Sequence, residues 1–216
     1  LAHVLFTRVL RYSAKHPDWF NRDRFILSAG HASILQYAML HLTGYGLTMD
    51  DLKDFRQLDS LTPGHPEAGH TAGVEVTTGP LGQGFANAVG MAISERWLRA
   101  KFGSGNINHN VFVICGDGDL SEGISHEAAS LAGSQQLGNL ICIYDDNHIT
   151  IDGPTELSLA DDASKRFEAY GWNVIDLGES GEDLDVLENA LLEAKSNTSS
   201  PTIIILRTHI GHPSPT

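Results

Sequence analysis

VFVICGDG, residues 111–118, is a short apolar run that ends in a turn bearing a carboxylate, and LICIYDDN, residues 140–147, repeats that pattern. Such runs are typical of buried parallel strands that deliver a side chain to the edge of a sheet. Between them, residues 121–138 carry apolar or small side chains near helical spacing, with Gly138 where a C-terminal cap belongs. Strand, helix and strand form a right-handed βαβ unit. We therefore expect an α/β domain with a parallel sheet and helices on both faces.

Oxygen-bearing side chains follow both predicted strands. Asp117 ends the first strand and Asn147 ends the second thirty residues later, about the length of one βαβ unit. Ligands of open parallel sheets lie beyond the carboxyl ends of the strands, and oxygen donors there suit Mg²⁺ or Ca²⁺. Mg²⁺ often completes its shell with phosphate oxygens, and Gly116 and Gly118 let backbone N–H groups approach an anion closely. The pattern indicates a metal and diphosphate site; alternatively, Gly-Asp-Gly is only a turn after a strand.

Four further short sequence motifs follow one another along the chain. They are Ser28-Ala29-Gly30-His31, Thr62-Pro63-Gly64-His65-Pro66-Glu67, Gly79-Pro80-Leu81-Gly82-Gln83-Gly84 and Asp145-Asp146-Asn147-His148-Ile149-Thr150-Ile151-Asp152-Gly153. Together with Gly116-Asp117-Gly118 they resemble the transketolase family, from near residue 1 to about residue 211. The resemblance implies a thiamine diphosphate-binding domain over residues 1–216, incomplete at its ends and without a second domain.

The resemblance also implies how a cofactor is held. Thiamine diphosphate and Mg²⁺ are expected, with Ca²⁺ able to replace Mg²⁺, and the metal ligands are Asp117, Asn147 and the main-chain carbonyl of Ile149. The residues implied to contact the cofactor are His31, Gly79, Pro80, Leu81, Gly116, Asp117, Gly118, Asn147 and Ile151. Among them, backbone groups around Gly79 and the side chain of Leu81 are expected to face the cofactor rings.

Three residues are implied to be catalytic, namely His31, His65 and Glu122. His31 stands at a predicted strand-to-helix turn near the positive end of a helix dipole, and histidine titrates near working pH, as proton transfer requires. From its position alone, His31 is alternatively a capping or packing histidine. The family pattern makes His65 a substrate contact and Glu122 part of a carboxylate network across a dimer interface. Without the resemblance, Glu122 is an ordinary first-turn helix acid.

The remaining pattern predicts the scaffold. Helices are expected over residues 1–15, 31–42, 83–102, 161–170 and 182–195, and further strands over residues 25–28, 172–177 and 202–207. The expected buried stripes are Ile34, Leu35, Ala38, Met39 and Leu42 in the second helix and Phe85, Ala88, Val89, Ala92, Ile93 and Trp97 in the third. Many of the other side chains of the third helix are small, which is typical either of a subunit or domain interface or of ordinary core packing. His70 and His148 depart from the family pattern and are expected on the surface.

Composition limits the classes of partner. With 27 acidic and 14 basic residues the net charge is −13, which argues against nucleic acid or an anionic membrane, so a local cluster has to bind a phosphorylated substrate. Cys115 and Cys142 lie inside apolar runs, so we expect buried thiols rather than a disulfide or metal pair. No signal peptide or membrane-spanning run is visible, which favours the cytoplasm. The chain opens at Leu1 in mid-pattern and is expected to be a fragment.

By resemblance, the parent protein is expected to be a homodimeric enzyme of the pentose phosphate pathway. Its expected reaction transfers a two-carbon ketol group from a ketose phosphate to an aldose phosphate. The glutamate that activates the cofactor is expected in the next domain of the partner subunit, so the fragment alone is expected to be inactive. The alternatives are a dihydroxyacetone synthase and a transketolase-like subunit that binds without catalysis. A nucleotide-binding α/β protein fits poorly, because the sequence has no Gly-rich loop of dinucleotide spacing.

Overall fold

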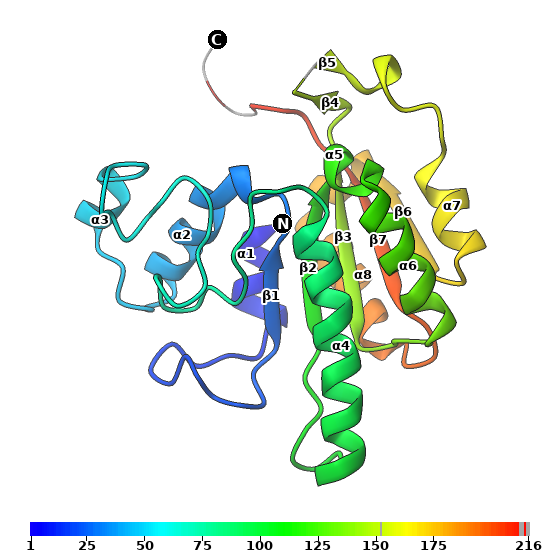
Figure 1. Ribbon diagram of the computed structural model, residues 1–216, viewed down its shortest axis with the longest axis horizontal. Helices are drawn as coiled ribbons and strands as arrows, with labels where there is room; N and C mark the ends of the chain where they lie inside the picture. The colour runs from blue at the N-terminus through cyan, green and yellow to red at the C-terminus, as the bar shows by residue number, and fades with distance from the viewer. Residues whose placement is uncertain (152, 212–213, 215–216) are drawn as a thin grey trace.

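A five-stranded parallel sheet forms the centre of the computed structural model, which describes residues 1–151, 153–211 and 214. The strand order is β1-β2-β3-β7-β6, and every neighbouring pair is parallel (Figure 1). The strands are β1 (Arg24–Leu27), β2 (Val111–Gly116), β3 (Leu140–Asp146), β6 (Asn173–Gly178) and β7 (Thr202–Arg207). All the strands expected from the sequence are therefore present, with β1 and β6 shifted by one residue.

Hydrophobic cores lie on both faces of the sheet, because successive strand residues point to opposite sides. One face is covered by α4 (Gln83–Phe102), α6 (Gly123–Ser134) and α7 (Ala163–Ala169), and the other by α8 (Leu184–Ser196), α1 (Ala2–Val4) and the π-helix Leu5–Val9. Figure 1 shows α4, α6 and α7 in front of the sheet and α8 behind it. Cys115 and Cys142 are buried free thiols in the first core, as expected. The predicted α/β architecture is confirmed.

The remaining elements are short and lie around this core. They are the 3₁₀ helix Gly30–Ala32, α2 (Ser33–Leu42), α3 (Met49–Lys53), α5 (Asp117–Ser121), the two-stranded β4 (Ile149–Thr150) and β5 (Gly153–Pro154), and the 3₁₀ helices Thr155–Leu157 and Glu179–Glu182. Among the described residues, no helix combines the length and apolar character that crossing a lipid bilayer requires.

The first helical segment is shorter than the helix expected over residues 1–15. It ends at Val9, and Leu10 already has extended backbone angles (φ −68°, ψ 135°). Asp23 holds the chain that follows: its carboxylate accepts the Arg11 N–H at 2.9 Å, and its own N–H donates to the Arg11 carbonyl at 2.8 Å. The chain therefore leaves the helix to pair with the residues that lead into β1.

Helix α2 buries only part of the expected stripe: Met39 is buried, and Leu35 and Ala38 are half-buried. Ile34 is 42% exposed and Leu42 is 73% exposed, whereas Tyr37 is fully buried. The cause is the packing partner, which is the loop before α4 rather than the sheet alone. Ser33 Oγ donates to the carbonyl of Gly64 at 2.9 Å, and the Tyr37 hydroxyl donates to the carbonyl of Pro63 at 3.0 Å. The spacing of apolar residues does not predict this buried face, because side chains of α2 hold it by hydrogen bonds to the backbone of the loop.

The helix expected over residues 121–138 is divided in two. Glu122 has an extended conformation (φ −68°, ψ 140°) between α5 and α6. Helix α6 packs through alanines, so Ile124 and Leu131, which were expected inside, are 37% and 47% exposed. The helix also ends at Ser134 rather than near Gly138. The short helix α5 before the break follows directly on the last residue of β2, so its first turn lies at the sheet edge.

Helix α4 has the expected boundaries but an unexpected buried acid. Most of the predicted stripe is buried or half-buried, whereas Trp97 is 59% exposed. Glu95 is fully buried and accepts a hydrogen bond from Asn139 Nδ2 at 2.8 Å. Arg99 Nε lies 3.6 Å from the same carboxylate. The C-terminal half of the helix is therefore held by polar contacts as well as by apolar packing.

Candidate functional site

The carboxyl ends of β1, β2 and β3 meet at one edge of the sheet. Gly116, at the end of β2, is in register with Asp145, near the end of β3. Helix α5 begins directly at Asp117, and β4 begins at Ile149. Figure 1 shows α5 and the β4–β5 pair together at this edge, above the sheet. The fold therefore gathers the two predicted strand ends in one place.

The carboxylate of Asp117 is buried at this edge, with 4% of the residue exposed. Its Oδ1 accepts a hydrogen bond from the Tyr144 hydroxyl at 2.5 Å. Its Oδ2 is buried without a hydrogen-bond partner. Burial raises the pKa of Asp117, and the hydrogen bond from Tyr144 opposes that rise. A buried carboxylate oxygen without a partner is the feature that a bound cation would satisfy.

The loop after β3 contains the other expected metal ligands. The side-chain oxygen of Asn147 accepts the Ile149 N–H at 3.0 Å, and Asn147 Nδ2 donates to Asp145 at 3.1 Å. An amide oxygen has two lone pairs, so this oxygen keeps one acceptor site for a metal. Ile149 is at the surface, and Ile151 is fully exposed, so the structure leaves the Ile151 side chain out of contact with the site.

Direct contacts hold the turn of residues 79–81 against both histidine segments and the first turn of α5. A methyl group added to Gly30 would lie 2.9 Å from the Gly79 nitrogen, so the turn bearing His31 packs closely on Gly79. A methyl group on Gly79 would lie 3.4 Å from the His65 ring, and one on Gly118 would lie 2.9 Å from Leu81. The structure thus brings the segments around His31, His65, residues 79–81 and Gly118 into one continuous surface.

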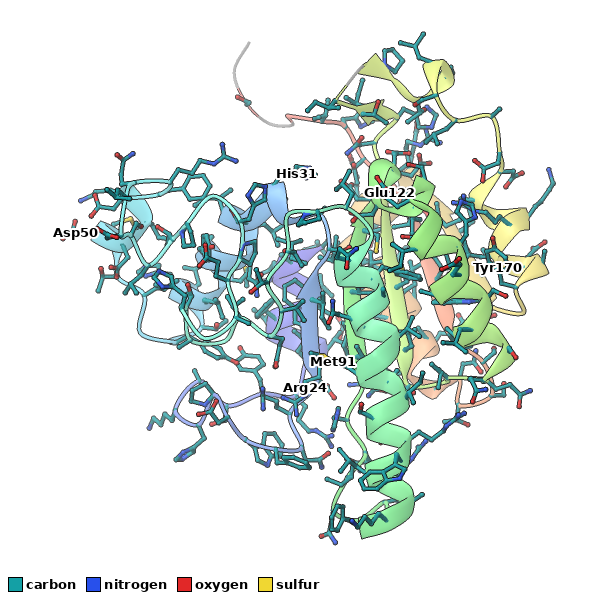
Figure 2. The ribbon with its side chains drawn as sticks, in the orientation of Figure 1. Arg24, His31, Asp50, Met91, Glu122 and Tyr170 are labelled. Atoms are coloured by element: carbon teal, nitrogen blue, oxygen red, sulfur yellow. The ribbon has the colours of Figure 1, made fainter. Side chains whose placement is uncertain are left out.

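The predicted catalytic side chains, with Pro80, are exposed around this surface. His31 and His65 are both exposed, as is Pro80 in the turn. Glu122 is exposed too, and a methyl group on Gly82 would lie 2.9 Å from its Cβ. Figure 2 shows His31 and Glu122 on the same edge of the molecule. The edge therefore offers two imidazoles and a carboxylate to solvent beside the buried Asp117.

Asp119 is a central residue of the site that sequence reasoning missed. Its carboxylate is 1% exposed and accepts three hydrogen bonds. The donors are Ser28 Oγ at 2.8 Å, the Gly82 N–H at 2.9 Å and the Gly116 N–H at 3.1 Å. These donors come from the end of β1, the turn before α4 and the end of β2. The available signal was a second aspartate in the first turn of a helix that starts at a strand end, where carboxylates cap backbone N–H groups.

A charged cleft of about 320 Å³ lies beside Asp117. Arg207, at the end of β7, is paired with Asp146 at 2.8 Å and contacts His148. The side chain of His148 is 44% exposed, so it lies at the surface as expected, although its ring contacts Arg207. Its backbone has a left-handed φ of 61°. His70 is also exposed as expected, with Nε2 2.9 Å from the Ser60 carbonyl.

The donor set at this edge fits an oxygen-coordinated divalent ion. Within residues 1–151, 153–211 and 214, no three His, Cys, Asp or Glu side chains cluster as a metal site. A metal at Asp117 therefore has to draw on the amide of Asn147, on backbone carbonyls and on ligands from outside the chain. That mixture of one carboxylate, neutral oxygens and external oxygens is what Mg²⁺ accepts.

Comparison with known proteins gives a consistent family. The family described as transketolase, thiamine diphosphate binding domain, matches residues 1–216. Transketolases from Nostoc sp. and Aquifex aeolicus are each 56% identical to this chain over its whole length, which spans 33% and 31% of theirs. The solved transketolase from Leishmania mexicana superposes with a TM-score of 0.93 at 51% identity, covering 96% of this chain and 31% of that one.

A second solved relative was crystallised with a sugar phosphate. The transketolase from Pichia stipitis in complex with sedoheptulose 7-phosphate has a TM-score of 0.93 at 47% identity, covering 96% of this chain and 31% of that one. The chain thus spans about a third of the length of the relatives it matches. On sequence, fold and site geometry together, the chain belongs to the transketolase family, within the thiamine diphosphate-binding domain of that family.

Proposed function

We propose that this chain is the part of a transketolase that binds thiamine diphosphate and Mg²⁺. In this proposal the whole protein transfers a two-carbon ketol group from a ketose phosphate to an aldose phosphate. The observation that carries the proposal is the buried, unpartnered Oδ2 of Asp117 at the sheet edge where His31, Gly79 and Gly118 also converge. The sugar phosphate bound by the Pichia stipitis relative supports the substrate class. Cytoplasmic location stays a prediction from the sequence.

The metal is proposed to bind between Asp117 and the loop that follows β3. Asp117 supplies the carboxylate, Asn147 its amide oxygen and Ile149 its main-chain carbonyl. With only one carboxylate in the protein shell, the diphosphate oxygens provide the remaining negative charge, which suits Mg²⁺ and also permits Ca²⁺. Gly116 and Gly118 lie at the start of α5, where an anion is favoured. Because the Gly116 N–H donates to Asp119, Gly116 offers the diphosphate a backbone surface without a side chain rather than a donor.

The ring half of the cofactor is proposed to lie along the turn of residues 79–81. Gly79 and Pro80 supply backbone surface, and Leu81 supplies an apolar side chain that already contacts the Gly118 position. Ile151 is proposed to cover the ring from the other side once the loop closes on a ligand. When bound, the cofactor supplies a nucleophilic carbon and an electron sink for breaking the carbon–carbon bond.

The chain's own part in the reaction is to hold substrate oxygens and move protons. His31 and His65 stand exposed on either side of Gly79, and imidazole groups donate and accept protons near neutral pH. We assign them to substrate hydroxyl and carbonyl oxygens. His31 also faces the diphosphate, and Glu122 joins a carboxylate network with a second subunit.

A second copy of the chain is proposed to pack on the outer face of α4. This face carries small side chains around a shallow groove of about 430 Å³, lined by Ala86, Asn87, Gly90, Met91 and Ser94. Small side chains allow helices to approach closely, and Glu122 lies near the same side of the molecule. We also infer that residues 1–216 form one domain and that its activity requires further domains.

The test is a ketol-transfer assay on the full-length gene product that contains this chain. A ketose phosphate donor and an aldose phosphate acceptor are supplied with thiamine diphosphate, with and without chelator. We expect turnover that needs both cofactor and divalent metal, and a loss of at least about 100-fold in Asp117→Asn, because the anionic ligand is removed. Cofactor binding without turnover would instead indicate a non-catalytic binding subunit. Metal-independent turnover would refute the proposed site.

A further inference from the structure

Tyr144 contacts the proposed metal ligand from inside the protein. It lies on β3, in register with Cys115 of β2, and is 7% exposed. Its hydroxyl is 2.5 Å from Oδ1 of Asp117. We propose that Tyr144 is a positioning residue that holds the Asp117 carboxylate so that only Oδ2 is presented to the divalent ion. This inference rests on the proposed function and deepens its metal site.

The hydrogen of the phenol group is directed to Asp117. A tyrosine hydroxyl has one hydrogen, and the other acceptor within reach, Oδ1 of Asp146, is 3.4 Å away rather than 2.5 Å. Asp146 is in turn held by Arg207, whose Nη2 lies 2.8 Å from its Oδ2. The salt bridge fixes the neighbouring carboxylate and leaves Tyr144 to bind Asp117.

The two oxygens of Asp117 are consequently unlike. Oδ1 accepts the Tyr144 hydroxyl, whereas Oδ2 is buried and has no partner. Because the Tyr144 hydroxyl approaches Oδ1 from β3, its hydrogen bond restricts rotation of the carboxylate about the Cβ–Cγ bond. Only Oδ2 then remains without a hydrogen bond in a fixed orientation, so we expect a divalent ion to bind Asp117 through this one oxygen.

Removal of the hydroxyl has a defined consequence. In Tyr144→Phe the ring keeps its packing on β3, but Oδ1 becomes a second buried oxygen without this donor. The carboxylate can then turn either oxygen outward. Partners that orient metal ligands are worth about 10- to 100-fold in metal affinity. We therefore expect Tyr144→Phe to weaken the metal by about that factor.

The experiment measures Mg²⁺-dependent binding of thiamine diphosphate to the full-length gene product. The cofactor is held at a fixed concentration and Mg²⁺ is titrated for wild type, Tyr144→Phe, Asp117→Asn and the double variant. Tyr170→Phe is the matched control, because it also removes a hydroxyl with a side-chain partner, His126 Nδ1 at 2.9 Å, and Tyr170 lies at the C-terminal end of α7. Thermal unfolding of each metal-free protein reports whether a variant simply loses stability.

Support consists of a 10- to 100-fold higher Mg²⁺ requirement in Tyr144→Phe, an unchanged requirement in Tyr170→Phe, and no further loss when Tyr144→Phe is added to Asp117→Asn. An unchanged requirement in Tyr144→Phe, with Asp117→Asn impaired, overturns this inference alone. An unimpaired Asp117→Asn overturns the proposed metal site and this inference with it.

A second measurement covers the case in which Tyr144→Phe does not fold. A crystal structure of the wild-type protein with Mn²⁺ and thiamine diphosphate locates the metal by its anomalous signal. The inference requires the metal on Oδ2 with the Tyr144 hydroxyl still on Oδ1. A metal bound to Oδ1, or to both oxygens, overturns it.

Discussion

Asp119 joins three segments that are far apart in the sequence. Its buried carboxylate accepts hydrogen bonds from Ser28, Gly82 and Gly116, which belong to the end of β1, the turn before α4 and the end of β2. Ser28 Oγ in turn accepts the Phe85 N–H at 3.0 Å. The spacing between the proposed ring and diphosphate surfaces therefore depends on one side chain that is hydrogen-bonded to the backbone on both sides.

Substitution of Asp119 tests that dependence. Asp119→Ala leaves three donors without their acceptor, and each buried polar group left unpaired costs roughly 1–3 kcal/mol. We expect the free energy of unfolding, measured by urea denaturation, to fall by at least about 2 kcal/mol. Asp119→Asn preserves the shape and one acceptor oxygen, so its loss should be smaller. A change below about 0.5 kcal/mol in Asp119→Ala would mean that the three segments are held by other contacts.

Sequence reasoning found the residues of the site that sit at strand ends. Asp117 and Asn147 were predictable because each follows an apolar run, and parallel strands place such residues at one edge. The partners of Asp119 and Tyr144 were not predictable, because they are fixed only when α4 crosses β1 and β3 pairs with β2. Ile151 illustrates the opposite case: the family pattern implies a cofactor contact, and the structure shows its side chain fully exposed.

At the scale of elements, α4 is held against β1 by a close backbone approach. A methyl group on Gly84 would lie 2.6 Å from Cα of Ser28, whereas one on Gly90, two turns along the same helix, would meet nothing within 4 Å. The first glycine is therefore required by packing, and the second is not required by any contact within the described chain.

This contrast gives a matched pair of variants. Gly84→Ala should destabilise by about 1–3 kcal/mol, because overpacking forces the backbones apart. Gly90→Ala should be neutral or stabilising by up to about 1 kcal/mol, because alanine favours a helix more than glycine. Both are measured by denaturant unfolding at high dilution, since Gly90 lies on the face proposed for a second copy. Equal losses in the two variants would refute the close-approach argument.

Element types were predicted better than helix faces. Strands β2, β3 and β7 are short, mostly apolar and β-branched runs that are buried, so their length and composition identify them. The stripe of α2 was wrong at Ile34 and Leu42, because the helix also packs on an irregular loop through Ser33 and Tyr37. The segment 121–138 was read as one helix because the break at Glu122 has no glycine or proline at the bend itself.

At the scale of the whole molecule, a buried histidine links stability to pH. His109 is 3% exposed and its Nδ1 has no hydrogen-bond partner. Burial, with the nearby Arg24, Arg11 and Arg22 guanidinium groups, lowers the pKa of His109 from 6.5 to about 4. The unfolded chain therefore binds a proton between these values that the folded chain does not.

The sign of the effect follows from that difference in proton binding. Because the unfolded state takes up the proton, this histidine reduces the free energy of unfolding as pH falls from about 6.5 toward about 4. The reduction is at most roughly 3.5 kcal/mol, since one pKa unit corresponds to about 1.4 kcal/mol and the shift spans about 2.5 units. His109→Gln should flatten the stability profile in this window, as measured by urea unfolding at a series of pH values. An unchanged slope would contradict the assignment to His109.

The central claim is that a divalent ion at Asp117 anchors the diphosphate of the cofactor. It is tested most directly by calorimetric titration of thiamine diphosphate into the full-length gene product, with Mg²⁺ and with chelator. Asp185→Asn is the charge-matched control, because Asp185 lies on α8 with its side chain 89% exposed. We predict binding that requires Mg²⁺ in wild type and Asp185→Asn and that is lost in Asp117→Asn. Equal affinity in Asp117→Asn, or undiminished binding in chelator, would contradict the account.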